Sequence, residues 1–135
     1  MILLDSSLII AYSNEVDENH AKAKKIIDDI VREKYGSPII TDYVFDEVVT
    51  VMLLRTKSLV HATKLGESLL GAAQLIRIDA NLFDTAWTIF KQQRKSKFSF
   101  TDCTTIAVCK ANRILNVATF DEDFSKLDIL NAIGP

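Results

Sequence analysis

Two aspartates occur close behind short apolar runs of the sequence. Asp5 directly follows the run 2–4, and Asp121 lies three residues after the run 114–118. Short, fully apolar runs are typical of buried strands in a parallel sheet. Ligands of such sheets bind outside the carboxyl ends of the strands. We therefore expect both side chains at one edge of one sheet, although Asp5 could simply cap the next helix and Asp121 could belong to an acid-rich turn.

Two further acids lie on predicted helices. Glu47 projects from the apolar stripe of a helix predicted over residues 43–55, where an unpaired carboxylate is costly to bury. Asp102 lies in the first turn of a helix predicted over residues 101–112, where the helix dipole favours an anion. A salt bridge at the rim of the core would also explain Glu47, and the dipole alone would explain Asp102.

Together these four acids would form a cluster of carboxylates, and no basic residue directly follows any of them: Asp5, Glu47, Asp102 and Asp121. Converging carboxylates repel one another and raise one another's pKa values unless a cation lies between them. Mg²⁺ and Mn²⁺ prefer oxygen ligands, and an ion of this kind activates water for attack on a phosphodiester. The pattern therefore predicts a catalytic site that binds one or two Mg²⁺ or Mn²⁺ ions.

The elements that must position these acids alternate between short apolar strands and amphipathic helices. This alternation predicts a single domain over 1–135, an α/β fold with helices on both faces of a central, mostly parallel sheet of four to five strands. The expected strands are 2–4, 39–40, 75–78 and 114–118, with a fifth edge strand around 128–130. The expected helices are 8–12, 17–35, 43–55, 58–73, 80–95 and 101–112. Phe83, Trp87 and Phe90, spaced i, i+4 and i+7, are predicted to pack in the core.

The pattern resembles the PIN-domain family, and within it the VapC-type toxin ribonucleases. The matching pieces are residues 2–7, 46–48, 99–102 and 118–124, in order along almost the whole chain. The resemblance implies a three-layer α/β/α sandwich, an acidic quartet of Asp5, Glu47, Asp102 and Asp121, accessory hydroxyls on Ser6 and Thr119, and Asp123 as a further metal ligand. It also implies cleavage of single-stranded RNA leaving a 5′-phosphate, a homodimer, and a small antitoxin protein as partner.

The overall charge of −2 does not by itself indicate a nucleic-acid partner. Any such contact must come from local patches, and the densest group of basic residues precedes Asp102: Lys91, Arg94, Lys95 and Lys97. We predict that these side chains contact RNA phosphates, which positions a strand without reading its bases. A solvated helix end is the alternative, and nothing in the residues alone distinguishes RNA from DNA.

The remaining composition limits where the protein works. Cys103 and Cys109 lie six positions apart on one predicted helix and point in different directions, so we expect two reduced thiols rather than a disulfide. Neither a leader peptide nor a membrane-spanning run is visible, which predicts a cytoplasmic protein without membrane association.

Three rival functions remain to be weighed. A phosphatase of the haloacid-dehalogenase type needs a second aspartate two positions after the first, where this chain has Ser7. A receiver domain needs paired acids after the first strand and a lysine after a late strand, and neither is present. The strongest rival is a PIN-like module that binds RNA or protein with little or no catalysis of its own.

Overall fold

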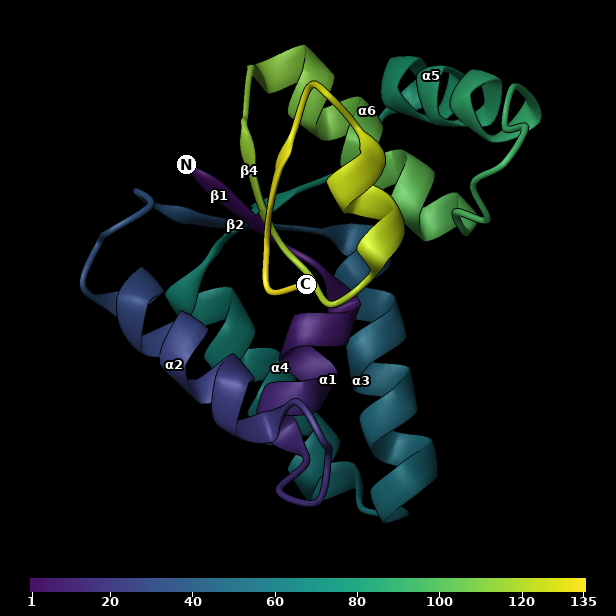
Figure 1. Ribbon diagram of the computed structural model, residues 1–135. Coiled ribbons are helices and arrows are strands. Elements are labelled where there is room, and N and C mark those ends of the chain that lie inside the picture. The colour runs from purple at the N-terminus through teal and green to yellow at the C-terminus, as the bar shows by residue number, and fades with distance from the viewer.

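The computed structural model describes all 135 residues and contains one parallel sheet enclosed by helices (Figure 1). The strands are β1 (Ile2–Leu4), β2 (Pro38–Thr41), β3 (Gln74–Ile76), β4 (Asn116–Ala118) and β5 (Asn131–Ile133). The helices are α1 (Ser6–Ser13), α2 (His20–Val31), α3 (Asp42–Thr56), α4 (Leu59–Ala72), α5 (Ala80–Lys91) and α6 (Phe100–Asn112), with a 3₁₀ helix η1 (Glu122–Lys126). The spatial order of the strands is β3-β2-β1-β4-β5, and all four pairings are parallel.

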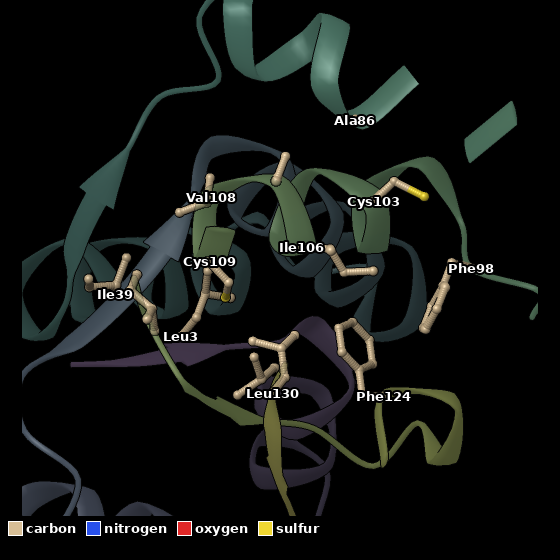
Figure 2. Packing of buried hydrophobic residues seen from close by; sticks show 13 residues of the cluster. Leu3, Ile39, Ala86, Phe98, Cys103, Ile106, Val108, Cys109, Phe124 and Leu130 are labelled. Carbon is tan, nitrogen blue, oxygen red and sulfur yellow. The ribbon is translucent and has the colours of Figure 1, made fainter. Parts of the chain in front are cut away.

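The sheet separates two apolar clusters, as successive side chains of a strand point to opposite faces. On β1, Ile2 and Leu4 join the cluster shared with α1 to α4, whereas Leu3 joins the cluster shared with α5, α6 and η1. Figure 2 shows the second cluster, in which Ile106 on α6 lies near Phe124 and Leu130. The predicted three-layer α/β/α sandwich is therefore confirmed.

Most element boundaries agree with the local sequence rules. Thr41 begins α3 by accepting a hydrogen bond from the Val44 amide at 3.1 Å, and Ser58 begins α4 in the same way through His61. The end of the chain differs from the prediction, because residues 122–126 form η1 and the fifth strand follows it at Asn131–Ile133 rather than at 128–130. The helix predicted over 80–95 ends at Lys91.

The predicted core position of the three aromatic residues on α5 is wrong. Phe83, Trp87 and Phe90 are 44%, 46% and 37% exposed. The face of α5 that packs on the core instead carries Ala86, fully buried, with Leu82 and Ile89 partly buried beside it. Since α5 carries two neighbouring apolar stripes, its periodicity did not specify which one packs inward.

Two smaller predictions concern the cysteines and the membrane. Cys103 and Cys109 are buried free thiols, and burial raises their pKa values to about 11 and about 12. None of the helices combines the length and the apolarity needed to cross a bilayer.

Candidate active site

The site lies where the strand order reverses. From the central strand β1 the chain continues to β2 on one side, and β4 lies on the other side of β1. Open α/β sheets bind ligands at such a switch point, which here lies at the carboxyl ends of β1 and β4. Leu4 pairs with Ala118, and the Asp5 amide donates to the Ala118 carbonyl at 2.9 Å. The side chains that follow these two strands are therefore brought together, as predicted.

Asp5 is held by two hydroxyls and is only 2% exposed. Ser7 Oγ and Thr119 Oγ1 donate to Asp5 Oδ2 at 2.6 and 2.8 Å. The same two hydroxyls accept hydrogen bonds from the backbone amides of Phe120 and Asp121 at 2.9 and 3.0 Å. This arrangement fixes Asp5 against the end of β4 and leaves Asp5 Oδ1 buried without any hydrogen-bond partner.

Thr119 thus makes the contact expected of it, whereas the hydroxyl expected from Ser6 is supplied by Ser7. Ser6 is 7% exposed, and its side chain forms none of the hydrogen bonds around Asp5. Both serines begin α1, and a helix rotates by about 100° per residue, so only one of them can face β4. Sequence spacing alone did not distinguish the two, although the adjacent hydroxyls in Asp5-Ser6-Ser7 marked the right segment.

Asp102 is placed by the cap of its own helix. Ser99 Oγ accepts from the Asp102 amide at 3.1 Å, and Asp102 Oδ2 accepts from the Ser99 amide at 2.8 Å, which completes a capping box at the start of α6. Burial, followed by the charge of Asp5, raises the Asp102 pKa to about 6 despite these hydrogen bonds, and Asp121 adds to the effect. Asp5 and Asp121 therefore both act electrostatically on Asp102.

Asp121 also uses one oxygen for local structure. Its Oδ1 accepts from the Asp123 amide at 2.9 Å and begins η1. Asp5, Asp102 and Asp121 consequently share one property, since each gives one carboxylate oxygen to local hydrogen bonds and keeps the other without a protein partner. No lysine or arginine forms an ion pair with any of the three.

Two other predicted acids have different surroundings. Glu47 is half-buried on α3 and forms no hydrogen bond or ion pair, but it is not among the charges that raise the Asp102 pKa. The structure does not bring Asp123 into the group, because both of its oxygens are engaged. Lys126 Nζ binds Asp123 Oδ1, and the Lys97 amide donates to Asp123 Oδ2 at 3.2 Å, which lowers the Asp123 pKa.

Comparison with known proteins places this arrangement in a family. Residues 2–130 match the family model of the PIN domain. The chain belongs to the PIN-domain family. It is 27% identical over 128 residues to the 23S rRNA-specific endonuclease VapC20 of Mycobacterium tuberculosis, which covers 93% of this chain and 92% of the relative.

Solved structures support the same assignment. The crystal structure of M. tuberculosis VapC20, described as a Sarcin-Ricin loop cleaving toxin, matches this PIN domain with a TM-score of 0.84 at 25% identity, over 96% of this chain and 97% of that one. A toxin-antitoxin complex from Klebsiella pneumoniae matches with a TM-score of 0.70 at 16% identity, over 97% of this chain and 96% of that one. VapBC2 from Rickettsia felis, bound to a DNA fragment from its promoter, matches with a TM-score of 0.69 at 14% identity, over 98% of this chain and 97% of that one. The last two show the shared fold.

The raised pKa of Asp102 predicts how the stability of this PIN domain depends on pH. The folded chain keeps the Asp102 proton up to about pH 6, whereas the unfolded chain releases it near 3.8, the ordinary pKa of an aspartic acid. Folding therefore takes up a proton in this window, and the contribution of Asp102 to the free energy of unfolding falls as pH rises from about 4 to about 6. Thermal melts in EDTA across this range should show that Asp102→Asn removes this fall.

Asp28→Asn, on the exposed face of α2, is the matched control and should leave the pH dependence of the wild type unchanged. An Asp102→Asn chain whose melting temperature follows pH as steeply as that of the wild type would show that Asp102 is not the group responsible.

Proposed function

We propose that this PIN domain is a divalent-metal-dependent endoribonuclease that cleaves single-stranded RNA and acts as the toxin of a type II toxin–antitoxin pair. The observation that carries the proposal is the group formed by Asp5, Asp102 and Asp121. Each of the three carboxylates keeps one oxygen without a protein partner, the charges of Asp5 and Asp121 both act on Asp102, and the free oxygen of Asp5 is buried. A buried, unpaired acceptor is costly, so it indicates a ligand.

The candidate ligands are carboxylate oxygens, the type of donor that Mg²⁺ and Mn²⁺ prefer. As the side chains lie, no three acidic, histidine or cysteine groups converge closely enough to enclose an ion by themselves. Mg²⁺ usually keeps several waters and takes only one or two carboxylates directly, so a complete protein cage is not required. Asp5 through Oδ1, with Asp102 and Asp121 through their free oxygens, would hold the ion, and Glu47 would join from α3.

When bound, such an ion activates water and neutralises charge on the scissile phosphate. The chain's own residues prepare the site for it. Ser7 and Thr119 hold Asp5 in one orientation, and Ser99 holds Asp102 at the start of α6. Because these hydrogen bonds come from the chain's own residues, they fix the orientation of Asp5 that an ion would meet.

RNA as substrate is supported by the relative VapC20, whose name specifies an endonuclease of 23S rRNA. Exposed basic residues from the end of α5 to the start of α6 supply cations for the phosphates: Lys91, Arg94, Lys95 and Lys97. Arg94 and Lys95, together with Lys110, line an open groove of about 420 Å³ on that side of α6. Contacts of this kind hold a strand without selecting its sequence.

An antitoxin partner is supported by an apolar groove between α1, α2 and α4, on the side of the sheet away from α5. The groove has a volume of about 410 Å³ and is lined by Ile27, Leu65 and Leu69, among others, and Val31 at its rim is 75% exposed. An amphipathic helix of a small protein would bury these side chains. The expected homodimer is a further part of the proposal, and a mass measurement in solution tests it.

Cleavage of matched oligonucleotides tests the proposed function. The purified chain should cut a single-stranded RNA in the presence of Mn²⁺ or Mg²⁺, leave a 5′-phosphate, and lose activity in EDTA, whereas a DNA strand of the same sequence should be cut much more slowly. Equal cleavage of RNA and DNA would overturn the choice of substrate. RNA binding without cleavage under any metal condition would favour the alternative, a PIN-like binding module.

A further inference from the structure

The outer face of α5 carries an aromatic surface that the fold leaves open. Phe83, Trp87 and Phe90 form one stripe along this helix, and each is more than a third exposed. Figure 1 shows α5 at the periphery of the molecule beside α6, the one helix against which it packs extensively. Large contiguous aromatic surfaces are uncommon on monomeric proteins and mark sites of interaction.

Phe100 joins this stripe to the elements of the active site. Its ring centre lies 5.1 Å from that of Phe83, 6.4 Å from that of Trp87 and 6.3 Å from that of Phe90. On its other side, Tyr43 meets Phe100 edge-on at 5.7 Å. We refer to Phe83, Trp87, Phe90, Phe100 and Tyr43 as the aromatic platform.

The platform borders the acidic group on two helices. Phe100 is the first residue of α6, whose first turn also carries Asp102. Tyr43 lies on α3 four residues before Glu47, and residues four apart on a helix share one face. Phe100 and Asp102, two residues apart, point to different sides of the first turn of α6, so a strand that crosses this end of the helix would pass both the carboxylates and the platform.

One cation lies directly against the platform, a combination typical of surfaces that bind single-stranded nucleic acid. Lys91 Nζ lies 5.7 Å from the centre of the Trp87 ring, and Arg94 and Lys95 follow in the next turn of chain. Asp84 is the one acid within α5. Protein interfaces are depleted in lysine, whereas single-strand binding surfaces combine aromatic rings with cations that follow the backbone.

We propose that the aromatic platform stacks an unpaired base of the substrate strand, with Trp87 and Phe90 as the principal contacts. Their rings lie nearly parallel, at an interplanar angle of 14° and 5.6 Å between centres, and stack on each other, so a base could extend this stack. Stacking on aromatic rings is how proteins hold splayed bases of single-stranded RNA. The proposal rests on the proposed function and adds a subsite for a nucleotide beside the scissile bond.

Trp87 is the single tryptophan of the chain, so its fluorescence reports on the platform directly. Titration of the wild type in EDTA with a single-stranded oligouridine should quench this fluorescence, in parallel with binding measured by anisotropy of a label on the RNA. An oligonucleotide of the same length without bases should bind more weakly and leave the fluorescence unchanged. These two results are expected only if a base meets the ring.

Variants of Trp87 distinguish a loss of base stacking from a loss of electrostatic binding and from a loss of folding. Trp87→Ala should weaken oligouridine binding about tenfold, Trp87→Phe should retain most of the affinity, and neither should change the dependence of binding on salt. Val60→Ala, which trims a residue 75% exposed on α4, is the matched control and should bind like the wild type. Thermal melts of each variant confirm that the fold is kept.

Four results would overturn the proposal. Oligouridine that binds the wild type without quenching Trp87 would place the bases elsewhere. Trp87→Ala that cleaves and binds RNA as the wild type does would leave the proposed function intact but remove the subsite. A lower molecular mass of Trp87→Ala in solution would show that the platform joins two copies of the chain, whereas a wild type that neither binds nor cleaves RNA would remove the proposed function as well.

Discussion

Asp5→Asn is expected to reduce RNA cleavage by about a hundredfold to a thousandfold, the usual cost of removing a group that stabilises charge in the transition state. Asparagine keeps the shape of the side chain, and its carbonyl oxygen can still accept from Ser7 and Thr119. Its amide nitrogen, however, would take the place of the buried and unpartnered Oδ1. An N–H group cannot ligate a cation, so the site would lose a ligand while the fold is kept. Initial cleavage rates of a labelled single-stranded RNA in Mn²⁺ measure the effect.

The matched control for this experiment is again Asp28→Asn. It removes the same charge from the exposed face of α2, on a helix that contributes no residue to the acidic group. Asp28→Asn should cleave RNA at the rate of the wild type. An Asp5→Asn chain that folds and cleaves within a few-fold of the wild type would remove Asp5 from the catalytic site.

Mn²⁺ should raise the melting temperature of the wild type by roughly 10 °C when the ion is present at about 100 times its dissociation constant. The physical reason is that the ion binds the folded chain, in which Asp5 and Asp121 lie close enough to Asp102 to affect its pKa, and not the unfolded chain. Binding also relieves the repulsion by Asp5 and Asp121, which adds to the effect of burial in raising the Asp102 pKa. Differential scanning fluorimetry over a Mn²⁺ series, starting from EDTA, measures the shift.

Asp5→Asn and Asp102→Asn should each lose most of this shift, whereas Asp123→Asn should keep it. Asp123 is the matched acid, because it lies close in sequence to Asp121 but is paired with Lys126. A shift of equal size in all three variants would mean that Mn²⁺ binds elsewhere on the surface. An unchanged melting temperature of the wild type would contradict a metal site at these carboxylates.

The parts of the fold that could be predicted are those fixed by short-range chemistry. The apolar run at Ile2–Leu4 specified a buried strand, because a segment apolar on both faces must be covered on both sides. Asp5 at its end, and Thr119 beyond the end of β4, then had to lie together once the sheet was parallel. The capping box of Ser99 and Asp102 likewise depends on two residues only three positions apart in the sequence.

The parts that were mispredicted depend on which of two equivalent faces packs inward. On α5, the stripe of Ala86 and the stripe of Trp87 are both apolar, and only the position of α6 decides between them. The metal-ligand role predicted for Asp123 is left to the Mn²⁺ titration, but Lys126 and the Lys97 amide, which bind both of its oxygens, lie on elements that the sequence did not place. The choice of Ser7 over Ser6 has the same origin, since it is made by the direction of β4 relative to α1.

The most direct test of a metal-dependent nuclease at the ends of β1 and β4 is cleavage of one RNA before and after the ion is removed and returned. Wild type treated with EDTA should be inactive on a single-stranded RNA, and added Mn²⁺ should restore cleavage in the wild type and in Asp28→Asn but not in Asp5→Asn. Cleavage that continues undiminished in EDTA, or that Mn²⁺ restores equally in Asp5→Asn, would contradict a metal-dependent site built on these carboxylates.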